Sequence, residues 1–259
     1  MKMTGAGSFE TRLARGESDF LAAQRLRYGV FVEELGGNGP HVDHAERFER
    51  DEFDAVSEHL ILVDKHRDPG ELDHVVGVYR LMTERGASAA GRFYCDDEYD
   101  LSPLRQSGRR LLELGRSCVH PEYRGGTAVH LLWNALAAYV LAKDIEILFG
   151  VASFHGTDID ALRAPLSLLH HRHLAAPELR PRALKSAFRT EDLLSDEEID
   201  RPAAMREVPS LIKAYLRLGG VVGEGAFIDR AFNTTDICLI LDTAQMNEVQ
   251  SKIYTRGVK

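Results

Sequence analysis

Short apolar runs and longer amphipathic stretches alternate along the chain. An apolar stripe at i, i+3, i+4 and i+7 that starts at Tyr28 predicts a helix over residues 19–35, with Ser18 or Asp19 as its cap. Similar patterns predict further helices over residues 127–142, 158–173 and 208–218. Turn-forming residues between these stretches mark the ends of the predicted helices.

Apolar runs of strand length lie between the predicted helices. The expected strands cover residues 59–64, 75–82, 111–119, 145–151, 221–229 and 236–242. Residues 180–189 are basic and expected to be partly extended, and residues 190–201 form an acidic loop or short helix. This order predicts an α/β (α+β) fold, a mixed central sheet with helices on both faces. We expect a single domain over residues 1–259, with 190–259 as its least defined part.

Composition narrows the class of protein. The chain has 259 residues, of which 44% are hydrophobic and 28% charged, as in ordinary globular proteins. Its net charge of −8 argues against a protein that coats nucleic acid. The three cysteines lie far apart without a C-x-x-C motif, so we expect no disulfide framework and a reducing cytoplasm. The histidines of residues 170–173 have no cysteine or carboxylate at ligand spacing, so no metal is expected.

No segment has the pattern of a signal peptide or a membrane span. The longest apolar stretch, residues 131–142, contains Asn134 and falls short of the roughly 20 residues that cross a bilayer. We therefore expect a cytoplasmic protein, soluble or peripheral at the inner membrane.

The segment from Glu113 to Thr127 carries the most information about function. A predicted strand enters a turn of arginine and two glycines, and a predicted helix begins directly after it. The N–H groups and dipole of a helix N-terminus attract phosphate, and glycine lets the backbone approach a ligand closely. A turn that only connects the strand to the helix is an equally weighted alternative.

The motif V-x-P-x-Y-R-G at residues 119–125 resembles the signature of the GNAT (Gcn5-related) N-acyltransferase superfamily. The resemblance implies that the turn binds the pyrophosphate or phosphopantetheine of a thioester donor. The residues implied are Arg124, Gly125, Gly126 and Thr127. Thr127 and Val129 stand where the family has small residues, which favours phosphopantetheine on an acyl carrier protein over coenzyme A. No permanently bound cofactor is expected.

A narrower resemblance covers most of the chain. Residues 113–124, L-L-W at 131–133, F-G-V-A-S-F at 149–154 and residues 209–219 resemble the bacterial ornithine N-acyltransferases. That family transfers a 3-hydroxyacyl group from acyl carrier protein to the α-amine of L-ornithine and gives lyso-ornithine lipid. The acyl-homoserine-lactone synthases are distant relatives of this family.

A site for ornithine needs acids for its amines and an arginine for its carboxylate. Asp51 and Asp54 are the candidate acids, and Arg80 and Arg116 lie in apolar strands where an unpaired charge is costly. We assign Asp51, Asp54 and Arg80 to substrate binding. The alternatives are a solvated loop for the two aspartates and a structural ion pair between Glu113 and an arginine.

The amine can attack the thioester directly, so no covalent enzyme intermediate is needed. We assign Glu113 as the candidate general base and count Arg116 with it as catalytic, and Arg116 is also, with Arg80, a candidate partner for the ornithine carboxylate. The backbone N–H groups of residues 113–119 are candidate oxyanion donors. Cys118 is interpreted as a buried structural cysteine. Arginines within residues 163–189 predict a docking surface for acyl carrier protein or membrane, or a solvated face.

Two other functions stay open. The first is an enzyme similar to the acyl-homoserine-lactone synthases. The second is a module that binds acyl carrier protein or lipid without turnover, which the residues at 127 and 129 allow.

Overall fold

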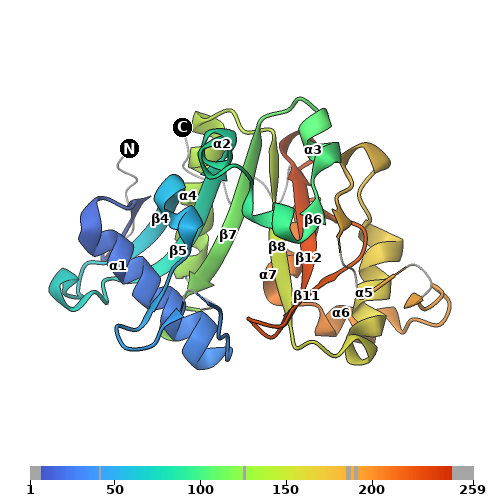
Figure 1. Cartoon of the computed structure of the whole chain (residues 1–259), viewed down its shortest axis with the longest axis horizontal. Coiled ribbons are helices and arrows are strands. Elements are labelled where there is room, and N and C mark those ends of the chain that lie inside the picture. The colour runs from blue at the N-terminus through green and yellow to red at the C-terminus, as the bar shows by residue number, and fades with distance from the viewer. Residues whose placement is uncertain (1–6, 41, 125–126, 185–187, 190–191, 247–259) are drawn as a thin grey trace. The chain divides into compact units, whose positions relative to one another are not determined.

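The computed structural model describes residues 7–40, 42–124, 127–184, 188–189 and 192–246. They form two compact units (Figure 1). The first unit holds residues 7–91 and 114–144, and the second holds residues 92–113 and 145–246. Strand β7 (Leu111–Val119) runs from the second unit into the first.

The first unit is built on strands β1 (Phe9–Leu13), β4 (Glu58–Asp64), β5 (Val75–Thr83) and β7, in that order. β4 pairs antiparallel with both β1 and β5. The sequence did not predict β1, because Phe9–Leu13 is a mostly polar edge strand whose partner is β4. β4, β5 and β7 lie where the apolar runs predicted strands.

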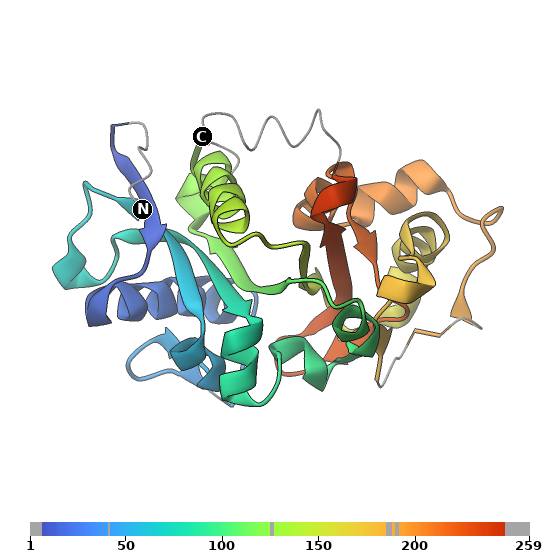
Figure 2. The same cartoon turned by 90° about the horizontal axis from the view of Figure 1, so that it is seen from above.

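Two helices cover opposite faces of this sheet (Figure 2). On one face, Ile61 and Val63 of β4 pack against Ala22 of helix α1 (Gly16–Arg27). Leu62 points the other way, toward Gly77, where an added Cβ would lie 3.5 Å from Leu132 of helix α4 (Thr127–Ala142). α4 has the predicted bounds, whereas the predicted helix 19–35 is α1 followed by a π-helix, η1 (Tyr28–Glu34).

Shorter elements complete the first unit. They are β2 (Val42–Asp43), β3 (Phe48–Glu49), η2 (Glu52–Val56), η3 (Pro69–Glu71), α2 (Glu84–Ala90) and η5 (Pro121–Tyr123). β2 and β3 form a hairpin, and η2 is a 3₁₀ helix that begins after Asp51. The acidic segment of the sequence is therefore folded and partly buried, with Glu49 only 1% exposed.

In the second unit, β7 pairs parallel with β8 (Ile147–His155) from Leu111 to Glu113. β8 pairs antiparallel along its length with β12 (Thr234–Asp242), which also pairs β10 (Val221–Val222) and β11 (Phe227–Asp229). The single strand predicted over residues 221–229 is interrupted, because Gly225 adopts a φ of 81° that a regular strand does not allow.

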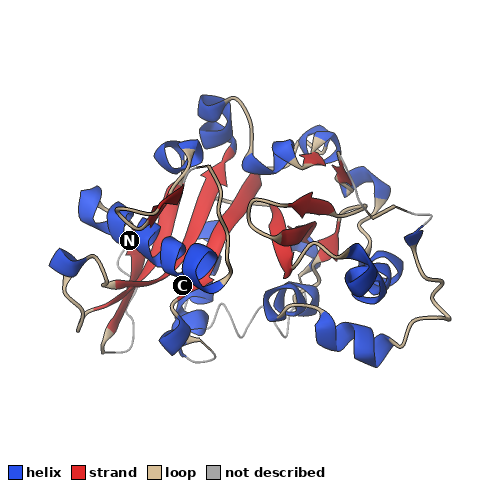
Figure 3. Ribbon diagram, turned by 60° about the horizontal axis from the view of Figure 1, so that its bottom comes forward, coloured by secondary structure: helices blue, strands red, loops and turns tan. Residues whose placement is uncertain are grey.

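Helices surround these strands in the second unit (Figure 3). They are α3 (Ser102–Gln106), α5 (Ile159–His173), α6 (Arg201–Glu207) and α7 (Ser210–Arg217). The remaining elements are η4 (Tyr94–Asp97), β6 (Tyr99–Asp100), η6 (Pro177–Leu179), β9 (Arg182–Ala183) and η8 (Thr243–Gln245). The predicted acidic loop contributes Ile199 to a buried cluster with Leu168 and Ala204.

The mixed α/β class is confirmed, and the single domain over the whole chain stays a prediction. Among the described residues, none of the helices combines the length and apolar character that a bilayer span requires.

Gly86 lies where α2 meets η2, and an added Cβ would stand 2.5 Å from the carbonyl oxygen of Val56. We expect Gly86→Ala to destabilise the protein by about 1–3 kcal/mol, because backbone must move to relieve the clash. Gly29→Ala is the matched control, since its added Cβ meets only Glu33 at 3.9 Å. Urea unfolding of both variants tests this, and equal midpoints would contradict it.

Candidate active site

Four of the predicted site residues come together in the first unit. Asp51 caps η2, where its carboxylate accepts the N–H of Phe53 at 3.0 Å, and Asp54 lies one turn further. Arg80 projects from β5 and Arg116 from β7. Arg116 has a φ of 48°, a left-handed conformation that is uncommon for a residue with a side chain and typical of functional sites.

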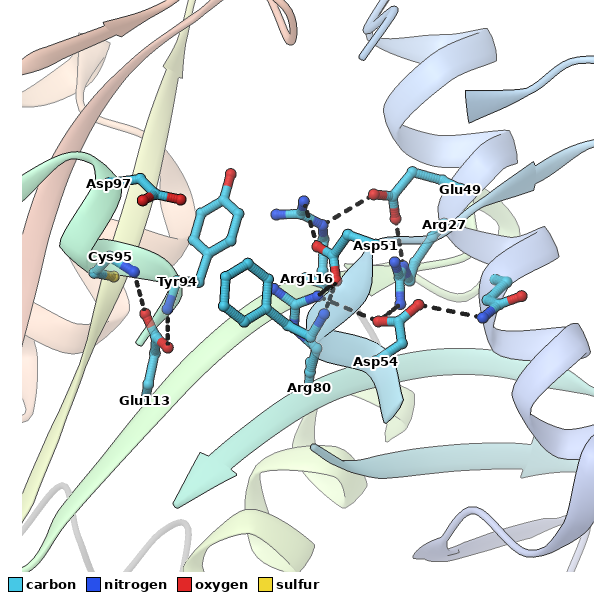
Figure 4. A network of polar contacts seen from close by, with 12 residues as sticks. Arg27, Glu49, Asp51, Asp54, Arg80, Tyr94, Cys95, Asp97, Glu113 and Arg116 are labelled. Atoms are coloured by element: carbon cyan, nitrogen blue, oxygen red, sulfur yellow. Dashed lines mark hydrogen bonds and ion pairs between the residues drawn. The ribbon is translucent and has the colours of Figure 1, made fainter. Parts of the chain in front are cut away.

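Six charged side chains alternate in sign around a closed ring, with each member bonded to two of opposite charge (Figure 4). Arg27 bonds Glu49 at 2.5 Å and Asp54 at 2.7 Å. Arg116 bonds the other oxygen of Glu49 at 3.1 Å and Asp51 at 3.0 Å. Arg80 closes the ring, with bonds to Asp51 at 2.5 Å and Asp54 at 3.2 Å.

The ring is electrically balanced, because three guanidinium groups face three carboxylates. Burial raises the cost of ionising the three acids, but the arginines outweigh it, so the pKa values of Glu49, Asp51 and Asp54 all lie below their ordinary range. The guanidinium of Arg27 is fully buried, and the attraction of Glu49 and Asp54 exceeds the effect of burial and raises its pKa. The three carboxylates and Arg27 are therefore charged at neutral pH.

His59 lies beside the ring but carries no charge at neutral pH. Its Nε2 donates to the carbonyl oxygen of Asp54 at 3.3 Å. Burial lowers the pKa of His59 to about 4, despite the opposing attraction of Asp54. The neutral imidazole therefore leaves the charge balance of the ring unchanged.

Asp51 and Asp54 do not belong to a solvated loop, since both are buried in the ring. Sequence reasoning missed Arg27 and Glu49. Arg27 follows Leu26 on the buried side of α1, and a charge at such a position was the available signal. Glu49 had no signal, because it is one of many acids in its segment.

Glu113 belongs to the second unit. Its two carboxylate oxygens accept the backbone N–H groups of Tyr94 at 2.9 Å and Cys95 at 2.7 Å. These bonds fix the carboxylate at the start of η4. Glu113 is also the last residue of β7 that pairs with β8, opposite Phe149.

Cys118 is buried, as interpreted from the sequence. Burial raises the pKa of its thiol to about 12, so the thiolate is scarce at neutral pH. All three cysteines are free and buried.

The predicted phosphate turn is described only at its two ends. Thr127 begins α4, and Gly125 and Gly126 lie outside the described residues. Arg124 donates through Nε to the carbonyl oxygen of Val119 at 3.0 Å. Its two terminal nitrogens donate to the carboxylate of Glu34 at 2.5 and 2.6 Å.

Most of the described arginines in the basic segment of residues 163–189 are paired with acids. Arg163 pairs with Asp160, and Arg172 pairs with Asp196. Arg180 and Arg182 both face Glu224, at 3.7 and 3.3 Å. Asp160, Asp196 and Glu224 thus neutralise much of the charge of this segment, and its role as a docking surface stays a prediction.

One group of acids outside these sites has a geometry that suits a cation. The carboxylates of Glu98, Asp229 and Asp236 each place an oxygen within 4.8 Å of the others in the second unit. Its members come from separate segments of the sequence, so their spacing along the chain does not predict the group.

In the first unit, β7 leads toward α4 past Arg124, within the part of the chain that a family model matches. The acetyltransferase (GNAT) domain model matches residues 26–134. The chain is 61% identical to the L-ornithine N(alpha)-acyltransferase of Rhodobacter capsulatus, over 97% of this chain and 96% of that protein. The chain therefore belongs to the L-ornithine N(alpha)-acyltransferase family and is an acyltransferase.

Two solved structures share the fold. The N-acyl amino acid synthase FeeM from uncultured soil microbes has a TM-score of 0.52 at 12% identity, with 92% of each chain covered. The acyl-homoserine-lactone synthase LasI has a TM-score of 0.51 at 15% identity, with 98% of each chain covered. At these identities the likeness shows the fold alone.

Replacing Asp54 by asparagine tests the charge balance of the ring. We expect Asp54→Asn to lower the free energy of unfolding by about 3–5 kcal/mol, because Arg27 and Arg80 each lose one buried counter-charge. The lowered pKa of Asp54 stabilises the fold above about pH 4, and this contribution disappears as the pH falls through the folded-state pKa. The variant should therefore lose less stability than wild type on acidification.

Asp43→Asn is the control, because Asp43 pairs with Arg50 at 3.3 Å near the surface. We expect it to change the free energy of unfolding by at most about 1 kcal/mol. Urea unfolding between pH 3 and 8 measures both variants. Parallel pH profiles for Asp54→Asn and wild type would contradict the expectation.

Proposed function

We propose that this acyltransferase moves a 3-hydroxy fatty acyl group from the phosphopantetheine thioester of acyl carrier protein to the α-amine of L-ornithine. The product is lyso-ornithine lipid. The observation that carries the proposal is the buried, balanced ring of three arginines and three carboxylates in a chain of this family.

The charge of the substrate fits the ring. Ornithine with a neutral α-amine has one negative carboxylate and one positive side-chain amine, so it adds no net charge to the site. Arg116 has the most exposed side chain of the three arginines, at 12%, and is the proposed partner of the substrate carboxylate together with Arg80. Asp51 and Asp54 are the proposed partners of the side-chain ammonium.

The same arrangement favours reaction at the α-amine. An α-amine has a pKa near 8, whereas a lysine-like side-chain amine has a pKa near 10.4. Near neutral pH the α-amine therefore loses its proton at a much smaller cost. Carboxylates that hold the side-chain amine as a cation increase this difference.

The reaction requires a single addition and elimination. The amine nitrogen attacks the thioester carbon and forms a tetrahedral oxyanion. The C–S bond then breaks and releases the carrier thiolate, which takes up a proton from solvent to give the thiol. Glu113, assigned from the sequence, is the proposed acceptor of the amine proton. The N–H bonds from Tyr94 and Cys95 hold that carboxylate in one orientation.

The donor site is proposed at the turn of residues 124–127. Arg124 and the first N–H groups of α4 are suited to a phosphate by charge and by hydrogen bonding. Acyl carrier protein is the proposed donor, with coenzyme A thioesters as the alternative. Contact with the inner membrane is proposed on the chemistry of the product, an amphiphile.

Turnover with a panel of amines tests the proposed function. We expect the purified protein to release thiol from 3-hydroxyacyl carrier protein with L-ornithine, and more slowly with L-lysine, L-glutamine or putrescine. Putrescine lacks the carboxylate that the two arginines would bind. Thiol titration measures the rate, and tandem mass spectrometry locates the acyl group on the α-nitrogen.

Two results would contradict the proposal. Absence of thiol release with every amine would favour a module that binds without turnover. Release that requires S-adenosylmethionine and yields a lactone would favour an acyl-homoserine-lactone synthase. The Asp43→Asn variant serves as the control for purification and assay, because Asp43 lies outside the ring.

A further inference from the structure

The guanidinium of Arg124 is held by an acid that the proposed function does not use. Glu34, the last residue of η1, accepts both terminal nitrogens of Arg124 in a bidentate pair. The third nitrogen, Nε, bonds the carbonyl oxygen of Val119. The donor groups of Arg124 that a phosphate would use are therefore occupied by a carboxylate.

The pair can open, because both of its side chains reach solvent. The Arg124 side chain is 41% exposed and that of Glu34 is 36% exposed. A solvent-exposed ion pair is weak, so a phosphate can displace the carboxylate from the guanidinium. The displaced Glu34 keeps its negative charge, since the pKa of Glu34 lies below its ordinary value through its bond with Arg124 and remains acidic without it.

We infer that Glu34 is a specificity-determining residue that selects the donor by the charge of its phosphate group. The inference rests on the proposed function, in which Arg124 binds the phosphate of the donor. Phosphopantetheine on a carrier protein is a phosphodiester with a single negative charge. The diphosphate of coenzyme A carries two, so the displaced carboxylate repels it more strongly.

The neighbouring acid differs in its partner. Arg47 donates to both carboxylate oxygens of Glu33 at 2.8 Å, so Glu33 is paired with another arginine than Glu34. Glu33 and Glu34 thus offer equal charges in adjacent positions, each paired with a different arginine. A change at Glu33 alters the net charge of the protein by the same amount as a change at Glu34.

Initial rates for Glu34→Gln, Glu33→Gln and wild type test the inference. The donors are matched 3-hydroxyacyl thioesters of acyl carrier protein, coenzyme A and dephospho-coenzyme A, with L-ornithine as acceptor. For Glu34→Gln we expect kcat/KM with coenzyme A, relative to that with carrier protein, to rise about five- to tenfold. For Glu33→Gln the ratio should stay within about twofold of wild type, because surface charges at a distance are screened.

The dephospho-coenzyme A thioester shows which phosphate of coenzyme A is repelled by Glu34. Dephospho-coenzyme A keeps the diphosphate and lacks the ribose 3′-phosphate, so it should gain as much as coenzyme A in Glu34→Gln. The gain should also shrink at high salt. The inference about Glu34 would be overturned if Glu34→Gln left the ratio of kcat/KM for the two donors unchanged, or if Glu33→Gln raised it equally. In either case, thiol release by the wild-type protein would leave the proposed function standing. Absence of turnover in wild type with all three donors would overturn the proposed function itself.

Discussion

Charge neutrality inside a buried ring is the constraint on which the first unit depends. Taking an ion out of water costs several kcal/mol, and each of the six ring members recovers that cost only through two partners of opposite charge. The members come from α1, β3, η2, β5 and β7 and the residue before η2. The ring therefore fixes segments that are far apart in the sequence, and a change of charge at one member removes one of the two opposite charges from each of its neighbours.

The same neutrality suits the proposed chemistry. A site with an unbalanced charge would hold either the carboxylate or the side-chain amine of an amino acid and reject the other. A ring of alternating signs presents a partner for each. Arg116 links this ring to β7, the strand that also carries Glu113 and leads toward α4. One strand thus bears residues proposed for acceptor binding and for proton transfer.

The sequence predicted this site in part. Arg80 and Arg116 stood out because charges in apolar strands need partners, and the bounds of β7 and α4 followed from their apolar patterns and the turn between them. Arg27 was not predicted because it precedes Tyr28, where the apolar stripe of the predicted helix begins. Glu49 was not predicted because nothing in the sequence distinguishes it from the other acids of its segment. β1 was missed because three of its five residues are polar and its partner β4 is distant in the sequence. The basic segment of residues 163–189 was overestimated because its acidic partners, such as Asp196 and Glu224, lie far away in the sequence.

The central claim is that the ring binds the amino-acid acceptor. Nuclear magnetic resonance of the arginine Nε–H groups tests it most directly, with L-ornithine and putrescine titrated into the labelled protein. The account predicts that L-ornithine shifts the Nε–H resonances of Arg80 and Arg116, and that putrescine, which lacks a carboxylate, shifts them far less. Saturating L-ornithine that supports turnover but leaves both resonances in place would contradict it.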